Sequence, residues 1–162
     1  PLLLALQLFT ATPLQADIQQ SIPHHYVSTV GYIDLTDLAL PDDQLIWPTN
    51  VTKLTRGFSN GHTGMDVDAR TGDPVYAAFP GTVTTVSHVG PYGNKIIISH
   101  PTHPEQITTL YAHLSTVSVT EGQAVGVGDI IGAVGATGNA DGDHLHFEVR
   151  LGEVQVDPVS YF

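Results

Sequence analysis

From Trp47 onward, the chain consists of short runs rich in valine, isoleucine and threonine, separated by glycines and prolines. Such runs are typical of β-strands, and no stretch after residue 47 has the spacing of apolar residues that an amphipathic helix needs. We expect strands at residues 75–79, 82–89, 95–99, 107–113, 130–134 and 144–151. The pattern therefore predicts an all-β fold.

Two segments of different character precede this region. Residues 1–14 are almost all apolar and are followed by Gln15-Ala16-Asp17, which is typical of the end of a secretory signal peptide. Because the apolar stretch is short for a membrane span, we expect a signal-peptide remnant at residues 1–16 and no stable membrane insertion of the mature domain. Residues 17–46 are expected to form a leading segment that partly covers the cleft of the domain at residues 47–162. Such a protein is secreted, periplasmic or associated with the cell wall.

Residues 119–132 contain glycines that return at short intervals between β-branched residues. This rhythm resembles the turn-rich half of lipoyl and biotinyl carrier domains. A carrier domain needs an acceptor lysine at an exposed hairpin tip, but the only lysines, Lys53 and Lys95, lie outside this segment. We therefore interpret the segment as scaffold.

The composition limits the chemistry that the chain can perform. The 162 residues include no cysteine, which excludes a thiol nucleophile, disulfides and a cysteine-based zinc site, so that any metal must be bound by histidine and carboxylate. Five Lys and Arg stand against sixteen Asp and Glu, and the net charge of -11 argues against nucleic acid as a partner. The length fits one domain, which we expect to be a monomer.

The first segment with candidate chemistry is Gly61-His62-Thr63-Gly64-Met65-Asp66. In an extended strand the side chains of His62 and Asp66 would lie about 13 Å apart, too far to share one metal ion. The chain must therefore bend between them, and we expect Gly61 and Gly64 to permit this bend because glycine adopts backbone angles that other residues avoid.

The second segment, at residues 144–149, alternates polar and apolar residues as a half-buried strand does. One face is predicted to carry His144, His146 and Glu148. The other face is predicted to carry Leu145, Phe147 and Val149. A third histidine-bearing segment, Leu110-Tyr111-Ala112-His113-Leu114, places His113 at the end of a β-run. Together the three segments supply two histidines and one carboxylate for a catalytic zinc, and two further histidines for proton transfer.

These segments also occur in a known family. Residues from about Trp47 to Phe162 resemble the lysostaphin-type, or LytM-like, zinc endopeptidases, which cut peptide bonds in peptidoglycan. The segments that carry the resemblance stand in the family's order: residues 62–66, Gly72-Asp73-Pro74-Val75-Tyr76-Ala77-Ala78, Gly81-Thr82-Val83, Tyr92-Gly93-Asn94, Tyr111-Ala112-His113-Leu114, residues 132–138 and His144-Leu145-His146-Phe147-Glu148.

The resemblance implies antiparallel sheets that form a shallow cleft, with the glycine-rich segment as the lipoyl-like half of the fold. It implies one Zn²⁺ per chain, held by His62, Asp66 and His146. It also implies that His113 and His144 are catalytic and that the substrate is a peptide of peptidoglycan. One departure from the family pattern is Asp143, which stands where proline is usual and adds negative charge beside His144.

Two other functions use parts of the same pattern. A metal-free member of the same fold would bind the cell wall or regulate a wall amidase without cutting, but such members lack ligands that this chain retains. A histidine phosphocarrier would use two nearby histidines, but it gives no reason for Asp66 at its spacing. The remaining histidines of the domain, His88, His100 and His103, flank strands near turns and are expected to be structural or solvated.

Overall fold

The computed structural model describes residues 43–162. The predicted signal-peptide remnant at residues 1–16 and most of the predicted leading segment, residues 17–42, lie outside the described residues. Within the described part, no helix is long and apolar enough to cross a membrane.

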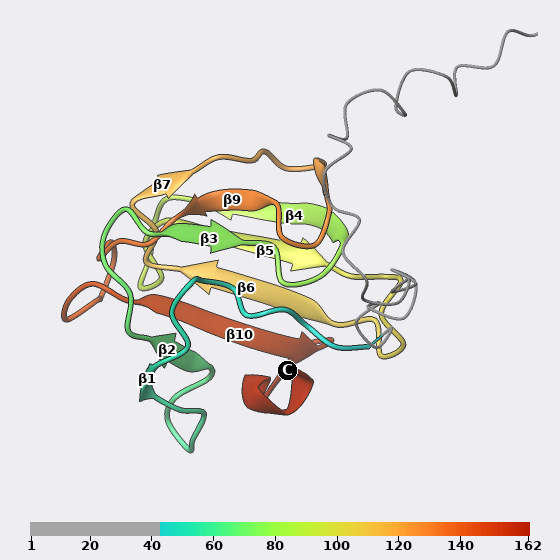
Figure 1. Cartoon of the computed structure of the whole chain (residues 1–162), viewed down its shortest axis with the longest axis horizontal. Helices are drawn as coiled ribbons and strands as arrows, with labels where there is room; N and C mark the ends of the chain where they lie inside the picture. The colour runs from blue at the N-terminus through green and yellow to red at the C-terminus, as the bar shows by residue number, and fades with distance from the viewer. Residues whose placement is uncertain (1–42) are drawn as a thin grey trace, which may run out of the picture. The chain divides into compact units, whose positions relative to one another are not determined.

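The described chain forms two antiparallel sheets and one short 3-10 helix (Figure 1). The larger sheet has eight strands: β1 (Leu54–Arg56), β2 (Met65–Val67), β10 (Leu145–Leu151), β6 (Thr108–Ala112), β5 (Lys95–Ser99), β4 (Gly81–Ser87) and β8 (Ala124–Val125) in spatial order, with β11 (Val154–Val156) paired to β10. The smaller sheet has three strands in the order β3 (Pro74–Tyr76), β9 (Ile130–Ala133) and β7 (Thr116–Val117). The 3-10 helix η2 spans Pro158–Tyr161.

The prediction of an all-β, antiparallel fold is confirmed. Each of the six predicted strands corresponds to an observed strand, namely β3, β4, β5, β6, β9 and β10. The sequence pattern missed β1, β2, β7, β8 and β11, which are only two or three residues long. Strands of this length show no readable alternation, and they form because a neighbouring strand offers backbone hydrogen bonds.

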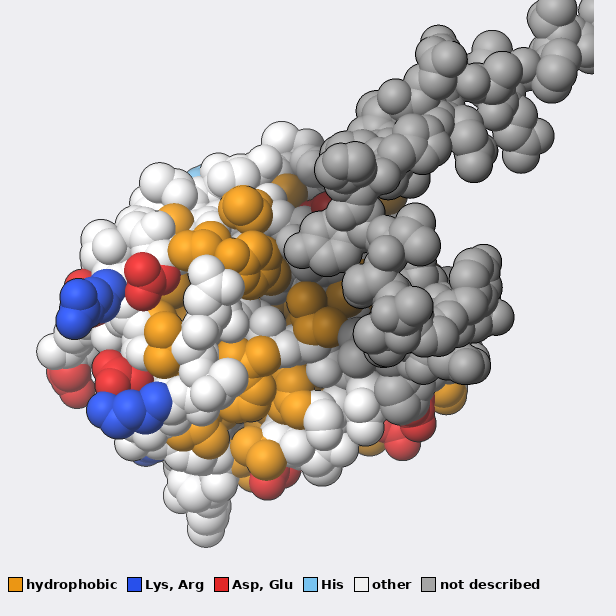
Figure 2. Space-filling model, in the orientation of Figure 1, with side chains coloured by type: hydrophobic (Ala, Val, Ile, Leu, Met, Phe, Trp, Pro, Cys, Tyr) orange, Lys and Arg blue, Asp and Glu red, His pale blue; other side chains and the backbone are white. Residues whose placement is uncertain are grey.

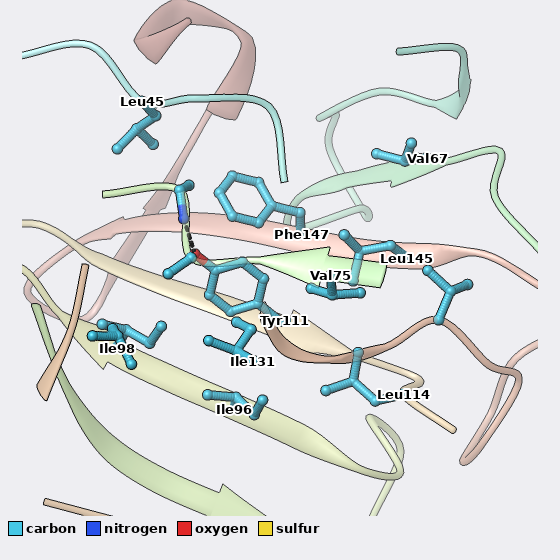
Figure 3. Close-up of a cluster of buried hydrophobic side chains, with 14 of the residues drawn as sticks. Leu45, Val67, Val75, Ile96, Ile98, Tyr111, Leu114, Ile131, Leu145 and Phe147 are labelled. Carbon is cyan, nitrogen blue, oxygen red and sulfur yellow. Dashed lines mark hydrogen bonds between the residues drawn. The ribbon is translucent and has the colours of Figure 1, made fainter. Parts of the chain in front are cut away.

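The hydrophobic core lies between the two sheets (Figure 3). Val75 and Ile131 of the smaller sheet pack with Ile96, Tyr111 and Phe147 of the larger one, and all five side chains are buried. The phenol oxygen of Tyr111 accepts a hydrogen bond from the backbone N–H of Ala78 at 2.9 Å, which satisfies the buried hydroxyl. The two sheets therefore hold each other in place through side chains that alternate inward along each strand.

Hydrophobic side chains are also visible across the middle of one molecular face, between acidic and basic side chains at its rim (Figure 2). Ile130 on the smaller sheet is 58% exposed, and Val127 in the preceding turn is also exposed. Single exposed apolar residues are normal on protein surfaces. We therefore assign no role to this face.

The first described residues belong to this packed structure. The backbone N–H of Leu45 donates to the carbonyl of Tyr161 at 2.8 Å, and that of Ile46 donates to the carbonyl of Ala78 at 2.9 Å. The Leu45 side chain is buried in the core, and the ring centroids of Trp47 and Phe162 lie 4.7 Å apart. Residues 45–46, which we assigned to the leading segment, thus pack against both the end of the chain and the segment that follows β3.

Strand pairing brings distant parts of the sequence to one place. In the ladder between β2 and β10, His146 stands opposite Asp66, and in the ladder between β10 and β6 it stands opposite Ala112. Directly paired residues project to the same face of a sheet, with their Cβ atoms about 5 Å apart. The register therefore places the His62–Asp66 segment, His146 and the end of β6 next to one another.

Gly64 allows β2 and β10 to approach in this way. A Cβ atom at Gly64 would overlap the carbonyl oxygen of Phe147 and crowd the side chain of Glu148. Gly64 is not in the left-handed region, so the expected reason for this glycine, an unusual backbone angle, is wrong. Its role is the close packing of the turn before β2 against β10.

We expect Gly64→Ala to lower the free energy of unfolding by about 1–3 kcal/mol, because backbone atoms cannot move aside without disturbing the ladder. Gly57→Ala is the matched control, since a Cβ there has no atom within 4 Å and the backbone is not left-handed. Urea unfolding of the two metal-free variants measures the difference. Equal stability of the two variants would show that the predicted overlap is relieved at no cost.

A buried polar chain links the end of β5, β6 and the segment between β3 and β4. His100, which follows β5, is fully buried; its Nδ1–H donates to the carbonyl of Pro80 at 2.9 Å, and its Nε2 lies 2.8 Å from the hydroxyl of Thr109. That hydroxyl lies 3.0 Å from the phenol oxygen of Tyr111. Burial disfavours the imidazolium and lowers the pKa of His100 to about 4, although the hydrogen bond to Pro80 opposes this shift. The expectation that His100 is structural is confirmed.

The pKa of His100 makes the fold sensitive to acid. In the unfolded chain the pKa is about 6.5. Because the folded value is lower, the contribution of His100 to stability is complete above about pH 6.5 and is lost as the pH falls toward about 4. We expect wild-type protein to lose about 2–3 kcal/mol more than His100→Gln between pH 7 and pH 4.5, measured by urea unfolding at each pH. Equal losses in the two proteins would contradict this assignment.

Candidate metal centre

One cleft of the described domain is lined by all five side chains that the sequence singled out. These are His62, Asp66, His113, His144 and His146. They come from the turn before β2, from β2 itself, from the end of β6 and from the start of β10. Segments up to 84 residues apart thus meet where the three adjacent strands β2, β10 and β6 present them.

Three of these side chains form a compact donor set. The Nε2 atom of His62 lies 3.1 Å from Oδ1 of Asp66, and Nδ1 of His146 lies 2.8 Å from the same oxygen. One donor atom from each residue lies within 4.8 Å of the other two. Only small fractions of these side chains reach solvent: 8% for His62, 13% for Asp66 and 6% for His146.

The turn between His62 and Asp66 bends as the sequence predicted. Gly61 has a φ of 100°, in the region that favours glycine, and Ser59 and His62 exchange backbone hydrogen bonds of 3.0 and 3.1 Å around it. This narrow loop turns His62 back over the start of β2. Its imidazole then reaches Asp66, which an extended chain would not permit.

Each cleft histidine has one ring nitrogen held by an acceptor. The Nδ1 atoms of three of them lie 2.7–2.9 Å from backbone carbonyls: His62 from Gly57, His113 from Thr137 and His144 from Gly142. Carbonyl oxygens only accept hydrogen bonds, so these Nδ1 atoms carry the hydrogen and each Nε2 is left with a lone pair. In His146 the arrangement is reversed, because Nε2 lies 3.0 Å from Glu148 and Nδ1 faces Asp66. The second ring nitrogen of His62 and that of His146 both lie against Oδ1 of Asp66, so a metal ion bound there could contact all three side chains.

His113 and His144 form a pair beside the donor set. Their ring centroids lie 4.8 Å apart, and Nε2 of His144 lies 3.8 Å from Oδ1 of Asp66. His113 has a φ of 62°, which is uncommon for a residue with a side chain. Its N–H donates to the carbonyl of Tyr92 at 2.9 Å, and this contact and the bond to Thr137 hold it there. Such backbone strain is a common feature of functional sites.

The charges in the cleft favour an ionised carboxylate. Burial raises the pKa of Asp66, but the hydrogen bond with His146 and the charges of the surrounding imidazoles outweigh burial, so the net pKa is lowered. Burial lowers the pKa of His113, and the hydrogen bond to Thr137 offsets only part of this effect. Near neutral pH, Asp66 is therefore anionic and His113 is neutral, which are the forms that bind a cation and accept a proton.

Sequence reasoning missed the residues that surround Glu148. We placed Glu148 on the face of His146, but gave it no role; its side chain is fully buried and accepts hydrogen bonds from Thr63 and Tyr92, both at 2.6 Å. Burial raises its pKa, but four hydrogen bonds, with that of His146 the largest, lower it to about 2. The strand alternation placed Glu148 on this face, and the family motifs contain Thr63 and Tyr92, but neither signal shows the contacts, because Tyr92 and Thr63 are 56 and 85 residues away.

Asp143, the departure from the family pattern, lines the same cleft and is bonded to the turn before β3. Its carboxylate accepts a hydrogen bond from the backbone N–H of Thr71 at 3.0 Å. The residue therefore fastens the loop before β10 to the turn before β3. Its hydrogen bond is made with the backbone of Thr71 and not with His144.

The donor set fits zinc. Two imidazole nitrogens and one carboxylate oxygen are typical ligands of a catalytic zinc, which keeps a fourth position open. With bonds of about 2.0–2.1 Å, two ligand atoms of a tetrahedral zinc lie about 3.3 Å apart. The distances of 2.8 and 3.1 Å from Asp66 to the two imidazoles are close to this value. The second nitrogens of His62 and His146 are also hydrogen-bonded, as is usual for metal-binding histidines.

Comparison with known proteins finds one relative named as a peptidase and one named as an activator of murein hydrolases. The DD-carboxypeptidase/endopeptidase Mpg of Neisseria meningitidis is 46% identical over 99 residues, which are 61% of this chain and 22% of Mpg. The murein hydrolase activator NlpD of Salmonella typhimurium is 32% identical over 130 residues, which are 78% of this chain and 33% of NlpD. The chain thus spans between a fifth and a third of the length of these relatives.

Solved structures share the fold. A zinc containing peptidase from Vibrio cholerae superposes with a TM-score of 0.65 at 33% identity, over 69% of this chain and 38% of that one. The catalytic domain of the antimicrobial peptidase lysostaphin from Staphylococcus simulans does so with a TM-score of 0.61 at 28% identity, over 67% of this chain and 90% of that one. The resemblance seen in the sequence motifs is confirmed. The family model described as peptidase family M23 matches residues 60–158, which include the five candidate site residues from His62 to His146. The chain therefore belongs to that family.

Proposed function

We propose that this chain is a zinc-dependent endopeptidase that hydrolyses peptide cross-links or bridges of bacterial peptidoglycan. The observation that carries the proposal is the convergence of His62, Asp66 and His146 on one point, with two further imidazoles beside them. Membership of family M23 and the relationship to Mpg support a peptidase acting on the wall. We further propose that the protein works in the cell envelope or outside the cell, as the names of its lipoprotein relatives suggest.

In this proposal His62 binds zinc through Nε2, His146 through Nδ1 and Asp66 through its carboxylate, with one ion per chain. Bound zinc would supply a Lewis acid that polarises the scissile carbonyl and lowers the pKa of water to about 7. The carbonyl of Gly57 and the carboxylate of Glu148 hold the two imidazoles in the orientation that this requires. These contacts thus orient the two imidazoles even in the absence of a metal ion.

His113 and His144 handle protons in this scheme. Both present a free Nε2 to the cleft, and their rings are in contact range of each other. A neutral imidazole accepts a proton from the attacking water, and an imidazolium returns one to the leaving amine or stabilises the oxyanion. The lowered pKa of His113 keeps this residue neutral near pH 7, which suits a proton acceptor. No HExxH sequence is present, so a glutamate of that kind is not the base.

The second candidate function is a regulatory one. NlpD is described as an activator of murein hydrolases, and a related role would require binding without cleavage. The complete donor set in this chain supports the enzyme over the regulator, because a regulator has no need of a zinc ligand cluster. The two functions differ in a measurable way: a regulator would bind no zinc at this cluster and would release no peptide fragments.

The two histidines of the His144-Leu145-His146 segment should respond differently to mutation. His146→Ala removes a ligand, so zinc content should fall from near one per chain to near zero and activity should be lost. His144→Ala leaves the three ligands in place, so it should keep zinc while hydrolysis slows by about 100- to 10,000-fold. Zinc is measured by elemental analysis, and hydrolysis by mass spectrometry of fragments released from defined peptidoglycans.

His88→Ala serves as the control, because His88 is exposed and contacts Asn94 outside the cleft. It should match the wild type in both measurements. Both cleft variants should remain folded, as checked by circular dichroism, because Leu145, Phe147 and Val149 fill the core from the other face of β10. Loss of zinc in His144→Ala with retention in His146→Ala would reverse the assignment, and a wild type that binds no added zinc would favour the regulator.

A further inference from the structure

Glu148 is a buried carboxylate in the middle of β10. Its side chain has no solvent exposure, whereas acidic residues are almost never fully buried unless they are paired. Removing a carboxylate from water costs several kcal/mol, which the surroundings must offset with charges and hydrogen bonds. The position therefore needs a physical explanation, and the family resemblance assigned Glu148 no role.

The two oxygens of Glu148 have separate partners. Oε2 accepts from Nε of Arg150 at 2.7 Å and pairs with its second guanidinium nitrogen at 2.5 Å. Oε1 accepts from the hydroxyls of Thr63 and Tyr92, both at 2.6 Å, and lies 3.0 Å from Nε2 of His146. The pair with Arg150 alone would neutralise the charge. Oε1 is left to contact three groups, all of which line the cleft.

The partners of Oε1 join the two segments that carry the donor set. Thr63 lies in the turn between His62 and Asp66, while His146 lies on β10, and Glu148 connects them through one oxygen atom. The missing Cβ of Gly64 leaves the space that the Glu148 side chain occupies. Tyr92, in the loop after β4, donates its hydroxyl hydrogen to the same oxygen. Its ring centroid lies 5.6 Å from that of His146.

We propose that Glu148 is a positioning residue of the metal centre, which holds Nε2–H of His146 and so directs Nδ1 toward Asp66 and His62. Thr63, Tyr92 and Arg150 fix the carboxylate in turn. This inference rests on the proposed zinc function, since it assigns to Glu148 the orientation of a zinc ligand. A carboxylate behind a metal-bound histidine makes the ring a better and more rigid ligand. The competing explanation is that Glu148 only stabilises the fold.

Zinc affinity separates the two explanations. We expect Glu148→Ala to weaken zinc binding by about 10- to 100-fold and Glu148→Gln to weaken it less, because the amide oxygen can still accept from His146. Thr63→Val and Tyr92→Phe each remove one donor to Oε1 and should weaken binding about two- to tenfold. The affinities are measured by competition with a chromogenic zinc chelator, on variants whose folding is checked by circular dichroism.

Thr109→Val is the matched control for a loss of stability. It breaks a buried polar contact with His100 and Tyr111, on the same sheet but outside the cleft. The control should lower the free energy of unfolding and leave zinc affinity unchanged. If Thr109→Val weakens zinc binding as much as Glu148→Ala does, or if the folded variants at positions 148, 63 and 92 all bind zinc like the wild type, the proposal is overturned.

A measurement without zinc keeps this test independent of the proposed function. In metal-free protein, the Nε2 proton of His146 should exchange slowly with water in nitrogen-15 NMR spectra, and the signal is assigned by its absence in His146→Ala. Glu148→Ala, which removes the acceptor, should speed this exchange at least about tenfold, whereas Thr109→Val should not. Slow exchange that persists in Glu148→Ala would contradict the positioning role. A wild type that binds no zinc but shows this difference would instead refute only the zinc function.

Discussion

The antiparallel pairing of β2 with β10 is the constraint on which the candidate site depends. It sets Asp66 opposite His146, and the pairing of β10 with β6 on its other side brings His113 to the same cleft. A slip of one residue in either ladder would turn His146 into the core and Phe147 into the cleft. The buried side chains of Leu145, Phe147 and Val149 oppose such a slip, so the core fixes the register and the register assembles the site.

The same constraint explains the polar residues that sit beneath the cleft. The turn before β2 can lie against β10 only because Gly64 has no side chain, and the space that remains holds the carboxylate of Glu148. The hydrogen bonds of Glu148 then join the turn, the strand and the loop that carries Tyr92. The close packing of the turn before β2 against β10 therefore also sets the orientation of the Glu148 and His146 side chains.

Much of the arrangement of β10 and of the His62–Asp66 turn could be predicted, because it depends on residues that are close together in the sequence. The alternation of residues 144–149 identified the apolar face of β10, and the spacing of His62 and Asp66 required a bend that Gly61 provides. The family motifs contain all five candidate residues that the structure brings to the cleft. Their assignment as ligands and catalysts still comes from the resemblance and remains a proposal.

The rest depends on contacts between distant residues, which single-sequence patterns do not show. We expected Gly64 to adopt an unusual backbone angle. Instead, a side chain is excluded there by the backbone of Phe147, which is 83 residues away. The left-handed backbone of His113 is held by Tyr92 and Thr137, neither of which signals this in the sequence. Short strands such as β1 and β8 likewise exist only through their partners.

The central claim is that His62, Asp66 and His146 bind one catalytic zinc ion. X-ray absorption at the zinc edge, recorded on protein loaded with one equivalent of zinc, tests it most directly. The account predicts two imidazole nitrogens and a carboxylate oxygen at about 2.0–2.2 Å, with a further light atom completing the shell. The imidazole contribution should fall in a His62→Ala sample, and the carboxylate oxygen should be missing from the shell in an Asp66→Ala sample. A shell without imidazole, or one that these substitutions leave unchanged, would contradict the claim.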